Sequence, residues 1–424
     1  MAFQNASDSN YLHVMAGSIS SGAITWGASS VKVADTSNDC SYGLTFDTSQ
    51  NCFVVAYQEG SALMATCGTV SGTAITLDTA NEVVVAGETF TRVRSVFDAT
   101  NNKTFIYCRG TGGTPSYGRS YSVSVSGTTP TMGYNYTWTT GTNTYDSADA
   151  VHDPDEERIV IVYRGSGTTG KMVLVDCSAF TPTGTSPIDI TPYASSGYGE
   201  GTISYDTGQN KAVIGVYDSD NSNYLSYVVA TIDASGSTAT FGDKVTQTTT
   251  YTRWPSPTKM IYDPDKSTNV ISFLDGGTYG SYVQTATVSG TTVSISALSE
   301  LRAADSTYAD AWVLNTMVYD PDEDKFVFVY IDKSDSNKML GLTFSAGSTN
   351  LTSTNFVGVS DAAITSSASG DITVRGGIAS AGLSSLTIGS KYYVQDAGTI
   401  TTVSSDVTAG LAISATSLIL SGDS

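Results

Sequence analysis

Basic residues are scarce in this chain of 424 residues, which has 20 Lys and Arg against 40 Asp and Glu and a formal net charge of −20. Proteins that bind the phosphate backbone of nucleic acid depend on Lys and Arg to displace counterions. The composition therefore argues against nucleic acid as a partner. Charged residues of both signs make up only 14% of the chain. Because helix surfaces are normally built from Lys, Glu and Arg, this scarcity favours an all-β protein.

Long apolar runs are also missing. No stretch reaches the roughly 18 uninterrupted apolar residues that predict a membrane-spanning helix. The opening MAFQNASDSN lacks the basic region and apolar stretch of a secretory signal. We therefore expect no membrane insertion and synthesis in the cytoplasm.

Cysteines are few and odd in number, and no pair has the two-residue spacing typical of a zinc or redox site. We expect them to be reduced side chains that fill space in strands. They are Cys40, Cys52, Cys67, Cys108 and Cys177.

One short pattern recurs six times in the chain. An aromatic residue or His is followed by Asp, a turn and an apolar strand, and the Asp residues recur at intervals of 51 to 57 residues. Between successive copies lies a second pair of strands, best seen as QTATVSGTTVSIS at 284–296. Each repeat therefore predicts four short antiparallel strands. The six repeated residues are Asp47, Asp98, Asp153, Asp206, Asp263 and Asp320.

A four-stranded unit cannot bury its apolar face alone, so several units must stack. Four strands at this period are typical of a β-propeller blade, whereas a β-sandwich gives no reason for six copies. We predict a β-propeller over residues 1–355. Six Asp-bearing hairpins favour six blades, but partial copies of the other hairpin at 11–33 and 338–348 keep seven open. The simplest closure places the N-terminal strands in the last blade.

The repeated Asp has two possible roles. Asp-Pro-Asp begins at Asp153, Asp263 and Asp320, and this sequence is typical of a type I turn that Asp caps and Pro preorganises. The acidic run from Asp320 to Asp324 could instead bind calcium. No loop matches the twelve-residue calcium pattern, and only the turn explains all six copies. We therefore predict structural turns, with no metal and no cofactor.

The composition changes near Phe356, after which almost every residue is small or β-branched. DITVRGG, KYYVQDAG and GLAISATSLIL indicate short strands joined by Gly turns. We predict a separate small β module at 356–424. A module of this size is marginally stable alone, so we expect it to anchor the chain or to form a homo-oligomer.

Four landmarks of this module carry a resemblance: Phe356-Val357-Gly358, the pair Gly376-Gly377, LTIGSKYYVQDAGTI at 386–400 and the closing AGLAISATSLIL. They resemble a module at the C-terminal ends of tail-fibre-like and other appendage proteins of tailed bacteriophages. The preceding repeats resemble those found upstream of that module. The resemblance implies a virion structural protein, with other virion proteins as partners, and it names no reaction.

Propellers also host sialidases and other glycosidases, so an enzyme is the alternative from another class. None of the six turns matches the sialidase Asp-box, Ser-x-Asp-x-Gly-x-x-Trp. His13 and His152 are too few for a triad or metal site, and His152 occupies the aromatic position of its repeat. A facing pair of carboxylates could always be proposed in so acidic a chain. The sequence therefore predicts no catalytic residue and no enzyme, with a carbohydrate-active propeller as the alternative.

A binding surface can be predicted from the order of the strands. The loop between the second and third strands shares a face with the loop that enters the next blade. Rigid aromatics beside polar loops suit recognition of a glycan or a protein; alternatively, these aromatics fill gaps between blades. The candidates are Tyr145, Tyr198, Trp254, Trp312, Arg109 and Arg164.

From these features we expect a non-enzymatic virion protein, located in the particle as part of a tail fibre or similar appendage involved in host attachment. A host-surface glycan is the candidate ligand. A capsid fibre or decoration protein is the alternative of the same class.

Overall fold

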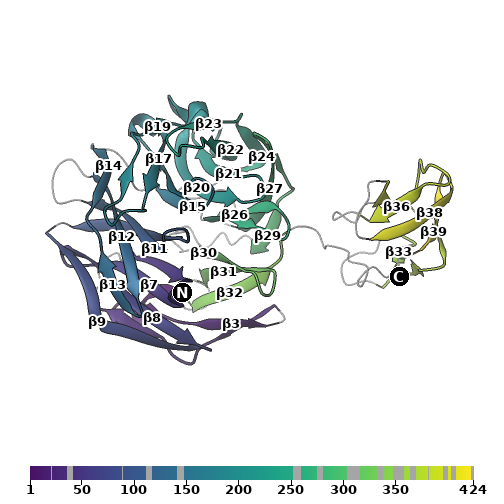
Figure 1. Cartoon of the computed structure of the whole chain (residues 1–424). Coiled ribbons are helices and arrows are strands. Elements are labelled where there is room, and N and C mark those ends of the chain that lie inside the picture. Colours follow the sequence, from purple (N-terminus) through teal and green to yellow (C-terminus); the bar gives the residue numbers. More distant parts are fainter. Residues whose placement is uncertain are drawn as a thin grey trace. The chain divides into compact units, whose positions relative to one another are not determined.

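The computed structural model describes residues 1–20, 22–35, 42–87, 89–110, 117–140, 148–251, 259–274, 280–302, 316–332, 338–346, 358–362, 369–380, 382–394, 400–402 and 407–421. The chain forms two compact units, Met1–Ser345 and Ala346–Ser424 (Figure 1). We refer to them as the first and second units and describe each by itself. The described residues include three short 3₁₀ helices, η1 (Ala6–Asp8), η3 (Ser166–Thr168) and η4 (Thr191–Tyr193).

The first unit contains six hairpins of one design, and each ends its first strand on the repeated Asp. In the first hairpin, Asp47 pairs with Cys52, so four residues form the turn. The other five hairpins have the same register. The strand pairs are β6 (Tyr42–Asp47) and β7 (Cys52–Glu59), β10 (Phe90–Asp98) and β11 (Lys103–Gly110), β15 (Asp149–Asp153) and β16 (Arg158–Arg164), β20 (Tyr198–Asp206) and β21 (Lys211–Asp218), β25 (Lys259–Asp263) and β26 (Thr268–Leu274), and β30 (Thr316–Asp320) and β31 (Lys325–Asp332).

Further strands complete each sheet. In four sheets the outermost position is shared by two strands, which both pair with the third strand. The third and outer strands are β8 (Ala62–Ser71) and β9 (Ala74–Ala86); β12 (Tyr117–Ser126), β13 (Thr129–Met132) and β14 (Tyr136–Thr140); β17 (Gly170–Asp176), β18 (Thr183–Gly184) and β19 (Ile188–Asp189); β22 (Tyr224–Ile232), β23 (Ala239–Phe241) and β24 (Val245–Tyr251); β27 (Ser281–Ser289), β28 (Thr292–Ile295) and β29 (Ser299–Arg302); and β32 (Lys338–Phe344).

The N-terminal strands meet both ends of this series of sheets. β1 (Ala2–Asn5), β2 (Tyr11–Val14) and β5 (Val31–Ala34) form a three-stranded sheet that shares a hydrophobic cluster with β7 and β8. β3 (Gly17–Ser20) and β4 (Ala23–Trp26) form a hairpin. β4 lies beside β32, where the Thr343 hydroxyl donates to the carbonyl of Gly22. The number of blades stays a prediction.

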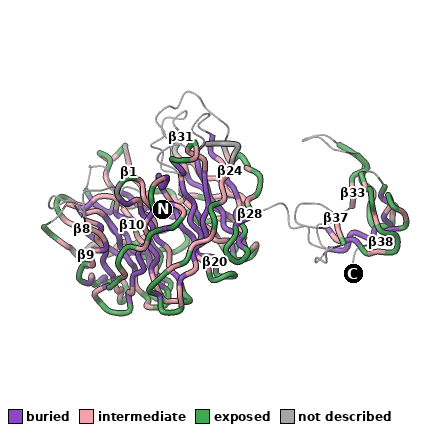
Figure 2. Tube along the Cα trace, turned by 90° about the horizontal axis from the view of Figure 1, so that it is seen from above, coloured by how far each residue is buried: buried purple, intermediate pink, exposed green. Residues whose placement is uncertain are grey.

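The core of the first unit lies between sheets, because each hydrophobic cluster combines side chains of two neighbouring sheets. In β16, Ile159 and Ile161 pack with β11 and β14, whereas Val160 and Val162 pack with the next sheet, β20–β22. A strand with both faces buried needs an unbroken apolar sequence. Figure 2 shows buried residues along the strands and exposed ones at the turns. The all-β propeller prediction is confirmed.

The second unit has its own small core. β33 (Gly358–Ser360) pairs with β34 (Ile372–Val374), and a five-stranded sheet has the order β35-β39-β38-β36-β37. Its core includes Tyr392, Val394, Ala409, Ala412 and Leu418. The strands are β35 (Ile378–Ala379), β36 (Lys391–Val394), β37 (Ile400–Thr401), β38 (Thr408–Ser414) and β39 (Ser417–Leu420).

Candidate functional site

All six repeated Asp residues accept hydrogen bonds from backbone amides of their own turns. Asp47 Oδ1 accepts from the amides of Ser49 at 2.9 Å and Gln50 at 3.0 Å. Each of the other five accepts from one or two amides of its turn. The fourth residue after each Asp has a positive φ, a conformation that Asn tolerates well. These residues are Asn51, Asn102, Glu157, Asn210, Ser267 and Asp324.

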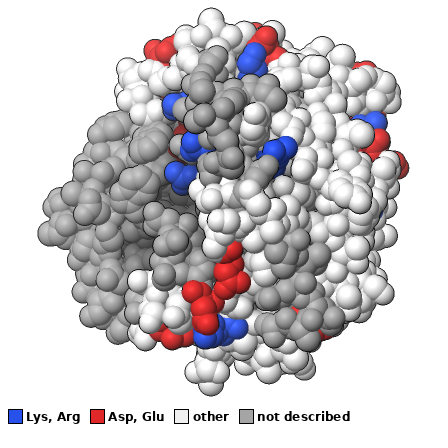
Figure 3. Space-filling model, turned by 90° about the vertical axis from the view of Figure 1, so that its left-hand side faces the viewer, with Lys and Arg blue, Asp and Glu red and all other residues white. Residues whose placement is uncertain are grey.

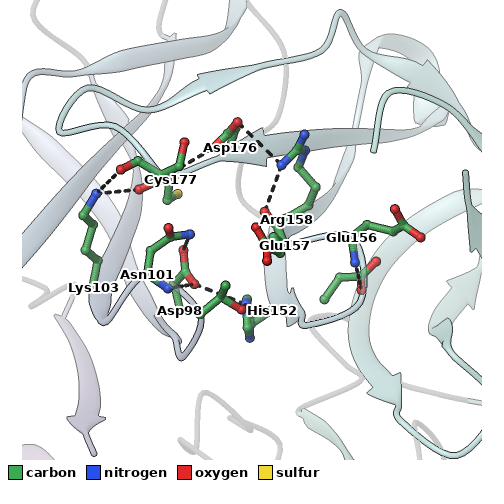
Figure 4. Close-up of polar contacts among 12 residues, drawn as sticks. Asp98, Asn101, Lys103, His152, Glu156, Glu157, Arg158, Asp176 and Cys177 are labelled. Carbon is green, nitrogen blue, oxygen red and sulfur yellow. Dashed lines mark hydrogen bonds and ion pairs between the residues drawn. The ribbon is translucent and has the colours of Figure 1, made fainter. Parts of the chain in front are cut away.

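The residue before the repeated Asp connects its sheet to the preceding one. The Tyr205 hydroxyl donates to Asp155 Oδ2 at 2.6 Å, and the Tyr319 hydroxyl donates to Asp265 Oδ2 at 2.7 Å. His152 occupies this position in its own repeat, and its Nε2 lies 3.2 Å from Asp98 Oδ1 (Figure 4). The aromatic position of the repeat is therefore a contact between neighbouring turns.

The residue that pairs with the repeated Asp across the hairpin can contact the following sheet, as Lys103 does. Lys103 Nζ donates to the carbonyls of Cys177, Ser178 and Ala179 at 2.7 to 3.0 Å (Figure 4). In the next sheet, Arg158 forms an ion pair with Asp176 of its own sheet at 3.5 Å. These side chains join strands and neighbouring sheets, which is a structural role.

The three predicted binding residues that the structure describes do not form one exposed surface. Tyr198 is fully buried, and its ring packs edge-on against Tyr193 at 5.7 Å. Its prediction as a surface residue is corrected, and the gap-filling alternative holds for it, because Tyr198 belongs to the hydrophobic cluster between two neighbouring sheets. Arg109 and Arg164 are half-buried near the ends of β11 and β16. The remaining candidates, Tyr145, Trp254 and Trp312, lie outside the described residues.

A polar cluster that the sequence analysis missed lies on the first strands of successive sheets, which contact one another in series. Arg94, Asp149, Thr202 and Lys259 each stand four residues before the repeated Asp. Asp149 Oδ2 accepts from the Thr202 hydroxyl at 2.6 Å, and Lys259 Nζ lies 3.0 Å from Asp149 Oδ1. We call Asp149, Thr202, Lys259 and the contacting Tyr107 the inner-strand cluster. The fixed position of Asp149, Thr202 and Lys259, four residues before the repeated Asp, is the sequence feature that could have identified this cluster.

The position of this cluster follows from the backbone. Neighbouring first strands belong to different sheets, so amides that face the preceding sheet need side-chain acceptors. The amide of Ile203 donates to Asp149 Oδ2 at 3.1 Å, and the amide of Met260 donates to Thr202 Oγ1 at 3.0 Å. The same contact therefore occurs at two successive sheet boundaries.

The cluster holds a largely buried carboxylate, because the Asp149 side chain is 13% exposed. Burial raises the pKa of Asp149, but the Lys259 charge and the hydrogen bonds from Thr202, Lys259 and Ile203 outweigh it and hold the pKa below its ordinary value. The hydroxyl of Tyr107 donates to Asp149 Oδ1 at 3.1 Å, and burial followed by the Asp149 charge raises the tyrosine pKa well above its ordinary value. At neutral pH the cluster therefore offers an ionised carboxylate and a phenol, with Lys259 Nζ beside the carboxylate.

The cysteines offer no activated nucleophile among the described residues. Cys52, Cys67, Cys108 and Cys177 are buried and form no disulfide, and burial raises the pKa of Cys67 to about 12. A thiol that stays protonated is a poor nucleophile. Cys40 lies outside the described residues.

Charged side chains are sparse on the face shown in Figure 3, where most of the described surface is neither acidic nor basic. Within the described ranges, no helix combines the length and apolar character needed to cross a bilayer.

No protein-family model and no curated protein matches the chain. Solved structures do match it. A proposed 6-phosphogluconolactonase from Bacteroides uniformis is 9% identical, with 80% of this chain and 93% of that chain covered and a TM-score of 0.51. A periplasmic gluconolactonase from Pseudomonas aeruginosa is 11% identical, with 79% and 96% covered and a TM-score of 0.44. A Hadza microbial sialidase is 9% identical, with 77% and 72% covered and a TM-score of 0.46.

The match to the proposed 6-phosphogluconolactonase corrects the expectation that the chain is not an enzyme, because a protein named as an enzyme has a similar fold. The absence of a recognised catalytic motif from a propeller sequence therefore does not exclude catalysis. At identities of 9% to 11%, the likeness shows the fold alone and assigns no reaction.

Proposed function

We propose that the chain is a virion protein of a tailed bacteriophage, in a tail fibre or similar appendage, where the second unit makes protein contacts. A capsid fibre or decoration protein is the alternative position in the particle. The sequence resemblance of the second unit suggests the class of protein. One structural observation supports the contact role.

That observation is a row of exposed apolar side chains across the five-stranded sheet of the second unit. Ile378 pairs with Ile419, and Ile419 pairs with Leu411. Their exposed fractions are 58%, 38% and 39% in that order. The neighbours Leu418 and Ala412 point into the core. A contiguous apolar patch on one face of a sheet favours association with another protein surface.

The row can be tested by oligomeric state. Replacing Leu411 and Ile419 by Lys should convert an assembled species to monomer in analytical ultracentrifugation, because two charges would have to be buried at the contact. Val318→Lys is the matched control, since Val318 is 55% exposed in β30 of the first unit. An unchanged sedimentation coefficient in the double variant contradicts a self-association role for this row.

The virion role has a separate test. Mass spectrometry of purified particles of the phage that encodes the chain should detect it at a fixed ratio to the major capsid protein. The distance of the chain from the capsid in a particle map then distinguishes a tail appendage from a capsid fibre. Absence of the chain from washed particles contradicts the proposal.

A carbohydrate-active propeller is the second candidate, and the inner-strand cluster is the observation that favours it. An ionised Asp149 can accept a hydrogen bond from a hydroxyl group or act as a nucleophile, and the Lys259 side chain is 34% exposed beside it. An ionised carboxylate is not itself a general acid, so glycoside cleavage would require a second carboxyl group.

Glycan binding and glycan hydrolysis should be measured on the intact protein. If the cluster serves this function, Asp149→Asn should abolish either activity. Asp189→Asn should leave it unchanged, because Asp189 forms an exposed ion pair with Lys171. Equal activity in both variants excludes the cluster as the site.

A further inference from the structure

Three carboxylates from two neighbouring turns meet at the boundary between the β25–β26 hairpin and the β30–β31 hairpin. Asp263 and Asp265 belong to the first turn and Asp324 to the second. Each offers a carboxylate oxygen, and the three oxygens lie within 4.8 Å of one another. Like charges at this spacing repel one another unless a cation lies close by.

Asp263 is the buried member of the group. Its side chain is fully buried, and its Oδ1 accepts from the amides of Asp265 and Lys266, both at 3.0 Å. Its Oδ2 is buried without a hydrogen-bond donor. A buried carboxylate oxygen without a donor requires compensation from another source.

The groups already present compensate only part of the charge. Lys266 Nζ contacts Asp324 Oδ2. The Tyr319 hydroxyl lies 2.7 Å from Asp265 Oδ2 and 3.1 Å from Asp324 Oδ1, but it has one proton for two carboxylates. Three carboxylates and one ammonium group leave two negative charges, which equals the charge of one divalent cation.

An earlier pair of turns in the same unit provides a comparison. There, Asp153 and Asp155 correspond to Asp263 and Asp265, and Asn210 corresponds to Asp324. With its amide nitrogen facing Asp155, Asn210 donates to Asp155 Oδ2 at 3.0 Å. Asp153 Oδ2 also lacks a donor, but the third group is a neutral amide. The third carboxylate therefore distinguishes the later boundary from the earlier one.

We propose that Asp263, Asp265 and Asp324 bind a divalent cation, Ca²⁺, at the boundary of these two sheets. Ca²⁺ prefers oxygen ligands and accepts flexible geometry with several waters. The neighbouring Lys266 and the 43% exposure of Asp324 predict weak binding, in the range of about 10⁻⁴ to 10⁻³ M that is typical of extracellular modules. The sequence analysis predicted no metal, and this proposal is independent of the proposed function.

Calcium titration by isothermal calorimetry on the full chain tests the proposal, with Asp324→Asn as the decisive variant. Asn fits this turn, because Asn51, Asn102 and Asn210 hold the same position at positive φ. The variant should lose one binding site or bind at least tenfold more weakly. The control Asp155→Asn, which removes a carboxylate from the earlier boundary, should bind like the wild type.

Thermal unfolding gives a second readout. Ca²⁺ should raise the melting temperature of the wild type and of Asp155→Asn relative to EDTA, because a ligand that binds only the folded state stabilises it. It should not raise that of Asp324→Asn. The proposal is overturned if the wild type and Asp324→Asn bind Ca²⁺ with equal stoichiometry and affinity, or if neither binds.

Discussion

The two units of the chain bury their sheets in different ways. In the first unit, a strand such as β16 is buried on both faces by the sheets before and after it. In the second unit, the five-stranded sheet has one core and leaves Ile378, Leu411 and Ile419 exposed. Of the thirteen exposed large apolar residues among those described, seven belong to the second unit, which is much the smaller. In a series of repeated sheets, each sheet is buried by its neighbours. A single sheet leaves one face exposed unless another protein surface covers it.

The largest expected effect comes from a substitution that leaves a cavity between two sheets of the first unit. Ile161 is fully buried, so Ile161→Ala should lower the free energy of unfolding by about 2–5 kcal/mol. Urea unfolding should show the loss in the transition of the first unit only. Leu418→Ala, at a fully buried site of the second unit, should shift only the other transition. A common shift of both transitions would contradict independent cores.

A smaller effect is expected when the ion pair between Asp149 and Lys259, on neighbouring first strands, is broken. Lys259→Met removes the cation next to Asp149 and should destabilise the first unit by about 2–3 kcal/mol at pH 7, because a largely buried carboxylate loses its partner while Lys259 itself is partly exposed. The experiment is chemical unfolding at pH 7, with Lys171→Met as the control at an exposed ion pair.

The pair of Asp149 and Lys259 also predicts that the stability of the first unit depends on pH. The pKa of Asp149 in the folded chain lies below its ordinary value, so the carboxylate stabilises the fold fully above the unfolded pKa of about 3.9. This contribution is lost as the pH falls through the folded pKa. From pH 6 to pH 2.5, the wild type should therefore lose more stability than Lys259→Met. An equal loss would show that Asp149 is not the titrating group.

The smallest effect concerns a single hydrogen bond between turns. Tyr205→Phe removes the hydroxyl that donates to Asp155 and should cost about 1–2 kcal/mol, since this bond has a charged acceptor. Tyr134→Phe, at an exposed site, should change the melting temperature by less than the error. If both variants behave alike, the contact between turns contributes nothing measurable to the first unit.

Much of the fold could be predicted from the sequence, because the hairpins depend on local order. The Asp that caps each turn and the apolar run that follows lie within one short segment, so the six hairpins were visible at once. The inner-strand cluster was not, because Asp149, Thr202 and Lys259 come from three repeats. Only the alignment of neighbouring sheets brings them together. Tyr198 was assigned to a surface because one repeat alone does not show that its ring packs between two neighbouring sheets.

The contact between β4 and β32 has a consequence for how the first unit folds while the chain is being synthesised. The hydrogen bond from Thr343 to Gly22 spans 321 residues, which a ribosome adds in roughly 15–60 s at about 5–20 residues per second. During that time the N-terminal hairpin is synthesised but its partner strand is not. The intermediate sheets can assemble one after another as they emerge. The β3–β4 hairpin thus waits for a strand that is made near the end of its unit.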